Sequence, residues 1–211
     1  MLYKNLSGYF REKYGKRLGK ICIDGGFSCP NRDGVCGSGG CIYCGERGAG
    51  EHIEPTLSIG EQVRSALENA ARDDLFVAYF QNFTNTYADV DTLKARYDAA
   101  LIDERIRVLA IGTRPDCIDE EKAALIASYK GKVDVWVELG LQTIHPATAE
   151  YIRRGYNTPV YDDAVKKLHA IGAEGVTHVI LGLPDETEDM MLKTVRHAAE
   201  CGTDGIKLQL L

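Results

Sequence analysis

The sequence predicts an α/β fold in which six parallel strands alternate with helices and curl into a barrel-like array. Two observations predict it. Six apolar, β-prone segments are separated by segments whose apolar residues recur with the helical period of 3.6. Polar residues also occupy alternate positions along the last three strands, which is typical of a barrel interior. Strands that alternate with helices form parallel sheets with right-handed crossovers.

The predicted elements follow one another along the whole chain. The strands are expected at residues 20–27, 75–82, 106–113, 134–143, 175–184 and 205–211. The helices are expected at 58–72, 90–103, 119–129, 145–154 joined to 161–171, and 186–201. Ser58 followed by Glu61 predicts a capping box, and Asp119 and Thr187 open acidic first turns that suit the positive end of a helix dipole.

The direction of the polar side chains favours a barrel over an open doubly wound sheet. Strands of an open parallel sheet are buried on both faces and are nearly continuously apolar. Here Glu138 and Gln142 share one face of the fourth strand, His178 lies in the fifth, and Lys207 and Gln209 share one face of the sixth. Inward-facing polar groups on three successive strands predict a polar lumen, with the apolar faces under the helices.

The chain divides into an N-terminal basic arm or helix, residues 1–19, and a core, residues 20–211, that ends on the sixth strand with no helix after it. This ending predicts either a fragment or a last strand covered from outside the sequence. Six lysines and arginines lie in the first twenty residues, which we expect to be a solvated segment. The formal net charge of −6 argues against tight, non-specific binding of nucleic acid.

No apolar run is long enough to span a membrane, and the N-terminus lacks the apolar core of a secretory signal. We therefore expect a cytoplasmic protein with no membrane partner. This compartment matters for the seven cysteines, because clustered thiols in a reducing cytosol bind metal or perform chemistry more often than they form disulfides.

Four of those cysteines lie in the loop CPNRDGVCGSGGCIYC, residues 29–44. The preferred interpretation is a [4Fe–4S] cluster held by Cys29, Cys41 and Cys44, whose fourth iron stays open to a ligand. Cys36 provides a competing C-x4-C-x2-C set. A structural zinc site normally uses two C-x2-C pairs, of which only one is present, but a four-cysteine zinc loop stays open. A nucleophilic cysteine would not explain the clustering.

The sequence resembles the radical S-adenosylmethionine (radical SAM) superfamily, in particular the YhcC-type bacterial family related to the radical SAM part of the Elongator catalytic subunit. The resemblance implies a partial (β/α)6 TIM-like barrel of the radical SAM type. It covers almost the whole chain and rests, in order, on CPNRDG, GGCIYC, YFQNFTNTYA, GTRPDC, ELGLQTIH, RRGYN, VILGLP and IKLQLL.

The resemblance implies roles for individual residues around S-adenosylmethionine (SAM). Tyr43 would border the adenine. Gln142 and Arg154 match a Gln and Arg pair around the fourth strand, and the Arg154 guanidinium suits the methionine carboxylate. His178 stands near the ribose where other members often carry Asp. From their inward positions alone, Glu138, His178, Lys207 and Gln209 would contact SAM or substrate.

The sequence departs from the family pattern at two further places. Asn82, Phe83 and Thr84 occupy the place of the methionine-binding motif, where Gly-Gly-Glu or Gly-Gly-Thr is common, and their backbone carbonyls would still receive the methionine ammonium. Asp185 stands where the family usually has Gly.

The implied activity is reductive cleavage of SAM to a 5′-deoxyadenosyl radical that abstracts hydrogen from an unknown substrate. The implied partner is an electron donor such as flavodoxin or ferredoxin. One alternative is a non-catalytic iron–sulfur or zinc binding module, which explains the cysteines but not the polar lumen. Another is an Elongator-like RNA-modifying protein, which the basic N-terminal arm supports and the acidic remainder of the chain weakens.

Overall fold

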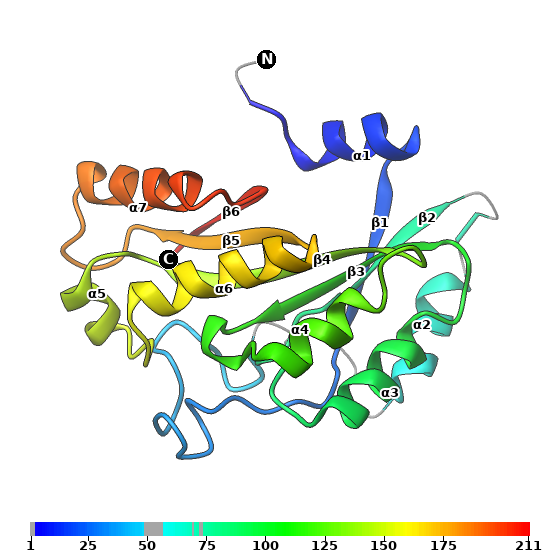
Figure 1. Cartoon of the computed structure of the whole chain (residues 1–211), viewed down its shortest axis with the longest axis horizontal. Helices are drawn as coiled ribbons and strands as arrows, with labels where there is room; N and C mark the ends of the chain where they lie inside the picture. Colours follow the sequence, from blue (N-terminus) through cyan, green and yellow to red (C-terminus); the bar gives the residue numbers. More distant parts are fainter. Residues whose placement is uncertain (1–2, 49–56, 69, 72–73) are drawn as a thin grey trace.

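The computed structural model describes residues 3–48, 57–68, 70–71 and 74–211 (Figure 1). Six strands form one sheet in the order β1-β2-β3-β4-β5-β6, and all neighbouring strands are parallel, which confirms the predicted topology. The strands are β1 (Leu18–Ile23), β2 (Leu75–Phe80), β3 (Ile106–Thr113), β4 (Asp134–Gln142), β5 (Glu174–Leu181) and β6 (Gly205–Leu210).

The sheet is curled into a half-barrel. In a flat sheet, β2 and β6 would be separated by four strand spacings, or about 19 Å. Instead, Nζ of Lys207 on β6 donates a hydrogen bond of 2.9 Å to the hydroxyl of Tyr79 on β2. The two strands therefore face each other across a lumen, as the predicted partial barrel requires.

The helices differ from the predicted ones mainly at their ends. They are α1 (Leu6–Tyr14), α2 (Ile59–Leu67), α3 (Val90–Ala100), η1 (Pro115–Cys117), α4 (Glu120–Ala127), α5 (Pro146–Tyr151), α6 (Thr158–Ile171) and α7 (Glu188–Glu200). The predicted caps at Ser58, Asp119 and Thr187 are present, including the reciprocal Ser58–Glu61 capping box. None of the helices in the described ranges is long and apolar enough to cross a membrane.

Backbone conformation explains where two predicted elements stop. The segment predicted as one joined helix is the separate pair α5 and α6, because Arg153 and Gly155 have φ values of 54° and 83°, which a right-handed helix excludes. Strand β5 ends at Leu181, just before Gly182 with φ 81°. Asp185 has φ 62°, a conformation in which glycine is favoured and aspartate is tolerated better than most residues.

The two faces of the sheet have different chemistry. The convex face is apolar and packs under α2, α3, α4 and α6, and Val137, Leu139 and Leu141 of β4 all point into this core. The concave face has a smaller apolar cluster near the N-terminal ends of the strands and polar residues beyond it. On the outer face of β6, Leu208 and Leu210 are exposed.

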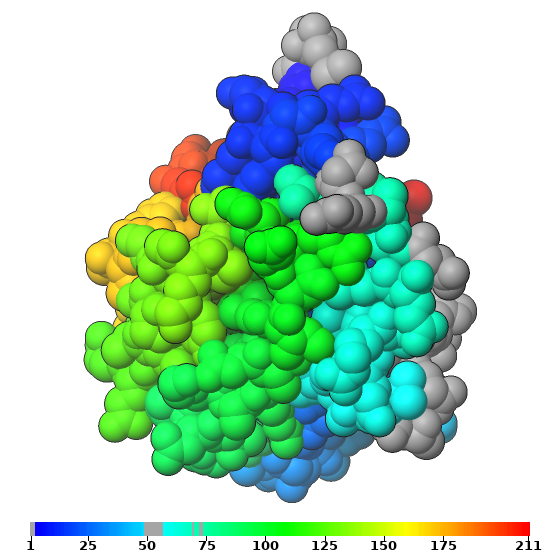
Figure 2. Space-filling model, turned by 90° about the vertical axis from the view of Figure 1, so that its right-hand side faces the viewer, coloured from blue at the N-terminus to red at the C-terminus, as the bar shows by residue number. Residues whose placement is uncertain are grey.

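Helix α1 closes the N-terminal end of the half-barrel. The Phe10 ring stacks on Trp136 of β4, with centroids 5.4 Å apart, and its side chain is only 4% exposed. The Tyr9 hydroxyl and Lys13 Nζ bond Glu174 at the start of β5. Figures 1 and 2 place α1 at the end opposite the loop that follows β1. The segment expected to be solvated therefore has one buried, aromatic face.

Replacing Phe10 by alanine tests whether α1 is an integral part of the fold. Loss of a buried aromatic side chain with incomplete relaxation costs about 3 kcal/mol. We expect Phe10→Ala to lower the free energy of unfolding by that amount in urea denaturation. Leu6→Ala on the same helix is the matched control, because Leu6 is 47% exposed and should change stability by less than about 0.5 kcal/mol. Equal effects of the two substitutions would contradict a packed α1.

Candidate active site

A cavity of about 240 Å³ opens between the loop after β1 and the lumen of the half-barrel. Parallel α/β barrels place their chemistry at this end, where the strands finish. Nine of the eleven predicted site residues line it: Cys29, Cys41, Tyr43, Cys44, Phe83, Thr84, Glu138, Gln142 and His178. Asn82 and Arg154 lie outside this lining, and so does Cys36.

The thiol loop is organised around Arg32. The Arg32 amide donates to the Cys29 carbonyl at 2.8 Å, and its guanidinium donates to the carbonyls of Cys44 and Gly45. Gly40, with φ 79°, passes so close that a Cβ there would lie 2.9 Å from Arg32 Nε. The loop therefore requires glycine at position 40, and Arg32 joins the strand-proximal thiol to the C-x2-C pair.

The thiols of the loop are not gathered closely enough to share a single zinc ion as they stand. Tetrahedral zinc with Zn–S bonds of about 2.3 Å brings its sulfur ligands to about 3.8 Å from one another. In the described part of the chain, no three loop thiols have sulfur atoms within 4.8 Å of one another. A [4Fe–4S] cube binds each thiolate through a different iron and so separates them more widely.

The cavity also supplies groups that suit a bound cofactor. Gln142 has φ 64° at an irregularity in the pairing of β4 with β5, and its buried Oε1 has no hydrogen-bond partner among the described residues. Gly140 leaves room for this side chain, since a Cβ there would lie 2.8 Å from Gln142 Nε2. An unpartnered buried acceptor is costly, which favours a ligand N–H at this position.

A charged network crosses the floor of the cavity. Oε2 of Glu138 on β4 accepts hydrogen bonds from the Tyr79 hydroxyl at 2.8 Å, His178 Nε2 at 2.6 Å and Lys207 Nζ at 3.2 Å. The four side chains come from β2, β4, β5 and β6. Lys20 of β1 adds a second ammonium 4.5 Å from the Tyr79 ring centroid.

Electrostatics hold the protons of this network in place. Burial alone would raise the pKa of Glu138, but the hydrogen bond and charge of His178, the charge of Lys207 and the Tyr79 hydroxyl outweigh it and lower that pKa to about 2. Burial and the Glu138 charge raise the pKa of Tyr79. Glu138 is therefore a fixed anion and Tyr79 a neutral donor, an arrangement suited to orienting a ligand rather than to accepting protons.

Arg154 lies behind the cavity wall. Its side chain is 2% exposed, its Nε donates to the Tyr156 carbonyl at 2.9 Å, and its Nη1 donates to the carbonyls of Leu141 and Thr143 at 2.7 and 2.5 Å. Burial lowers the pKa of Arg154. The guanidinium thus braces the C-terminal end of β4, and its predicted contact with a carboxylate stays a prediction.

The segment after β2 ties the ends of β1 and β2 together. Asn82 is fully buried, and its Nδ2 donates to Asp24 Oδ2 at 2.9 Å. The Thr84 amide donates to the Ser28 carbonyl at 3.2 Å, and Phe83 between them has φ 58°. Phe83 and Thr84 reach the cavity, whereas Asn82 positions them from beneath.

Sequence reasoning missed Arg114, Tyr156 and Tyr79, which also line the cavity. Arg114 forms a two-pronged ion pair with Asp116, donates to the Arg154 carbonyl at 2.9 Å and lies 4.8 Å from the Tyr156 ring centroid. Its position directly after the third strand was a usable signal, because barrel folds place functional residues there. Tyr79 shares its strand face with Val77. Strand β2, LFVAYF, is continuously apolar, so its sequence carried no signal for which face is inward.

The Glu138 carboxylate should make stability depend on pH. Its folded-state pKa of about 2 lies below the ordinary value of 4.5, so its contribution is present above pH 4.5 and is lost as the pH falls toward 2. We expect Glu138→Gln to lower the free energy of unfolding by about 3 kcal/mol at pH 7 and by about 1 kcal/mol at pH 3. Urea denaturation at both pH values checks this. Exposed Glu150→Gln is the control. A loss of unfolding free energy in Glu138→Gln that is the same at both pH values would contradict the network.

Comparison with known proteins agrees with this geometry. The family model of the Radical SAM superfamily matches residues 33–198. The chain is 36% identical to the uncharacterized protein YtqA of Bacillus subtilis over 99% of its length, and 37% identical to the protein YhcC of Escherichia coli over its whole length. It spans about two thirds of each relative, 66% and 68%.

Solved structures share the fold at low sequence identity. The Elp3 protein of the archaeon Methanocaldococcus infernus matches 92% of this chain and 46% of its own, with a TM-score of 0.65 and 16% identity. Coproporphyrinogen III oxidase of E. coli, a radical SAM enzyme, matches 90% of this chain and 43% of its own chain, with a TM-score of 0.62 and 15% identity.

The superfamily also confirms the expected cofactors, a [4Fe–4S] cluster and SAM. The methyltransferase TsrM of Kitasatospora setae, whose structure contains cobalamin and a [4Fe–4S] cluster, matches 92% of this chain and 34% of its own, with a TM-score of 0.60 and 17% identity. Six parallel strands, a thiol loop after the first of them and the family match lead to one conclusion: this chain belongs to the radical SAM superfamily.

Proposed function

We propose that this chain is the SAM-cleaving core of a radical SAM enzyme that abstracts hydrogen from a substrate in the half-barrel. One observation carries the proposal: three thiols of the loop and the charged floor of the lumen line the same cavity. When bound, the cluster supplies the electron that cleaves SAM to methionine and a 5′-deoxyadenosyl radical. The chain itself positions the groups and excludes water.

Cys29, Cys41 and Cys44 are the proposed cluster ligands. All three line the cavity, whereas Cys36 is exposed and lies outside the lining. Burial raises the pKa of Cys41, against the lowering effect of hydrogen bonds from Tyr43 and from Asn31, whose Nδ2 is 3.3 Å from the sulfur. Binding of iron at Cys41 would therefore displace a proton, as metal binding to thiols does.

SAM would lie between the thiol loop and the floor. Tyr43 packs against Ile152, Ile180 and Leu183, which gives the adenine an apolar border. Gln142 Oε1 would accept an N–H of the ligand. The backbone at Phe83 and Thr84 would receive the methionine ammonium, with Asn82 holding these residues in place through Asp24.

Arg154 is proposed for the methionine carboxylate through Nη2, a contact that requires the cavity wall in front of it to open, since its side chain is 2% exposed. Its Nε and Nη1 already donate to backbone carbonyls, whereas Nη2 donates no hydrogen bond to any of the described residues. An arginine fixed in this way loses little entropy when it binds an anion.

The floor network would orient the ribose or the substrate. Glu138 as a fixed anion accepts hydroxyl groups, while His178 and Lys207 provide donors close to it. A non-catalytic metal-binding module would not explain why these charged side chains meet in the lumen.

We propose a flavodoxin- or ferredoxin-type protein as electron donor. The clustering of four thiols in the loop favours a reducing compartment such as the cytosol.

Cysteine substitutions test the ligand set. Anaerobically reconstituted protein should contain about four irons and four sulfides per chain and give an EPR signal of a reduced cluster. Cys29→Ala, Cys41→Ala and Cys44→Ala should each abolish the cluster, because each removes one of only three protein ligands. Cys36→Ala is the matched control and should keep it.

Chemical analysis for iron and sulfide, together with EPR, distinguishes the alternatives. Loss of the cluster in Cys36→Ala with retention in Cys29→Ala would replace the proposed set by the C-x4-C-x2-C set. Stoichiometric zinc in place of iron in the unsubstituted protein would reject the cluster altogether.

Gln142→Met tests the proposed SAM contact. It removes the unpartnered Oε1 and keeps the length of the side chain, so stability should not fall. The dissociation constant of SAM should rise about 2- to 10-fold, which corresponds to one hydrogen bond of about 0.5–1.5 kcal/mol. Calorimetric titration of the cluster-loaded protein measures affinity, and thermal denaturation measures stability. Unchanged affinity together with lowered stability would assign Gln142 to the scaffold.

A further inference from the structure

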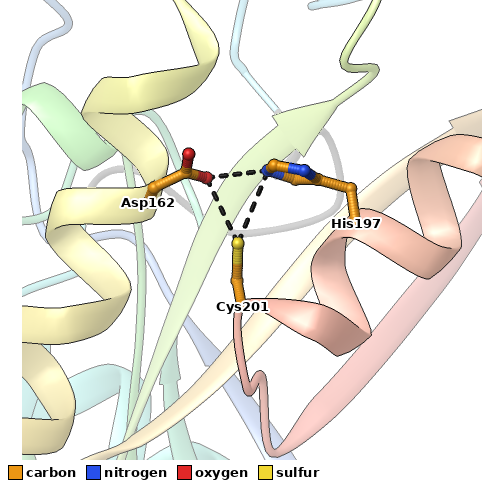
Figure 3. Close-up of side chains that lie close together, drawn as sticks. All are labelled: Asp162, His197 and Cys201. Carbon is orange, nitrogen blue, oxygen red and sulfur yellow. Dashed lines mark hydrogen bonds and ion pairs between the residues drawn. The ribbon is translucent and has the colours of Figure 1, made fainter.

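A second cluster of donor atoms lies on the outer wall of the half-barrel. Asp162 belongs to α6, His197 belongs to α7, and Cys201 follows the last residue of α7. Oδ1 of Asp162 is 2.7 Å from His197 Nε2 and 3.3 Å from the Cys201 sulfur, which in turn is 3.5 Å from Nε2 (Figure 3). None of the three lines the cavity of the candidate active site.

The Asp162 oxygen, the His197 nitrogen and the Cys201 sulfur form a triangle that differs from a catalytic Cys–His–Asp arrangement. In a Cys–His–Asp catalytic arrangement, the carboxylate holds the imidazole nitrogen opposite the one that faces the nucleophile. Here the Asp162 oxygen and the Cys201 sulfur both approach the same nitrogen, Nε2 of His197. Such a triangle does not relay a proton from thiol to carboxylate through the ring. It does present oxygen, nitrogen and sulfur donors to a common centre.

The dimensions of the triangle are close to those of a tetrahedral zinc site. Bonds of about 2.3 Å to sulfur and about 2.1 Å to nitrogen and oxygen imply separations of about 3.6 Å from sulfur to either donor and about 3.4 Å between nitrogen and oxygen. The observed separation of 3.5 Å between sulfur and nitrogen agrees. The Asp162 oxygen, at 2.7 and 3.3 Å, needs to retreat by less than 1 Å.

Sequence spacing and charge support the same conclusion. His197 and Cys201 are four residues apart and share one side of a helix, as two ligands from one helix must. Thiolate, carboxylate and neutral imidazole together balance a doubly charged ion. His197 and Asp162 side chains are 28% and 25% exposed, so an ion and a coordinating water have access. Lys166, the nearest cation on α6, is paired with Asp163 at 3.5 Å.

We propose that Asp162, His197 and Cys201 form a binding site for a zinc-type divalent cation that joins α6 to α7. Thiolate and imidazole select such a metal over magnesium or calcium, which prefer oxygen ligands. Because α6 and α7 flank β5 on the outer wall, the ion would fix the two helices to each other (Figure 1). Its role is structural, since the three residues lie outside the catalytic cavity.

Zinc X-ray absorption tests the site without interference from iron. One equivalent of zinc is added to the full chain after cluster loading, so that the loop thiols are occupied. In parallel it is added to a full-chain variant with Cys29→Ser, Cys36→Ser, Cys41→Ser and Cys44→Ser, which makes the test independent of the cluster. Both samples should show one sulfur at about 2.3 Å and the remaining ligands, nitrogen and oxygen, at about 2.0–2.2 Å.

Substitutions then identify the ligands. Cys201→Ala should remove the sulfur contribution and weaken zinc binding at least about 100-fold in calorimetric titration, because loss of even an outer-shell partner costs about 10- to 100-fold. Asp162→Asn should weaken binding and abolish any rise of the thermal midpoint with zinc. His169→Asn is the matched control on α6, since His169 faces Asp204 at 3.5 Å and should leave zinc affinity unchanged.

Two results would overturn the proposal. One is zinc bound without sulfur in both samples, or no zinc bound at all, which would reduce the triangle to a hydrogen-bonded contact. The other is an unchanged sulfur contribution in Cys201→Ala, which would place the metal at another thiol.

Discussion

The carboxylate of Glu138 is the point on which the curled sheet and its cavity both depend. Three donors from β2, β5 and β6 meet at one of its oxygens, although β3 and β4 separate β2 from β5 in the sheet. A buried carboxylate is costly unless it is paired and hydrogen-bonded. The network satisfies it only when the sheet is curled, so the polar floor favours the half-barrel over a flat sheet.

Strand β4 organises the lumen from one end to the other. Its inward-facing positions are, in order, Trp136, Glu138, Gly140 and Gln142. Trp136 receives the Phe10 ring of α1 and closes the N-terminal end. Glu138 forms the charged floor, Gly140 leaves space above it, and Gln142 offers an unpartnered acceptor near the thiol loop. The same strand turns Val137, Leu139 and Leu141 toward the apolar core, so that one element serves both scaffold and site.

The thiol loop is held by the barrel as much as by itself. Asn31 Nδ2 donates to the Arg153 carbonyl as well as to the Cys41 sulfur, and the Ile42 amide donates to the Ile152 carbonyl. The segment after α5 therefore supports both the loop and, through Arg154, the end of β4. Groups on the outer wall, such as Asp162, His197 and Cys201, are separate from this construction, and a metal there would act on the scaffold through α6 and α7.

The sequence by itself determined the six strands, the positions of most helices, the capping box at Ser58, the inward side of β4 and the thiol loop. All of these depend on local periodicity or spacing, which the chain carries whatever its overall shape. Only the tertiary structure decided that Phe10 of α1 packs on Trp136, that Arg154 braces backbone carbonyls, and that Arg114 and Tyr156 enter the cavity wall. The contacts of Lys207 with Tyr79 and of Asp162 with His197 also appear only in the tertiary structure. These contacts join residues far apart in the chain, and they depend on how far the sheet curls and how each helix crosses it. Alternation along a strand reveals which side chains share a face, but not which of them meet across the lumen.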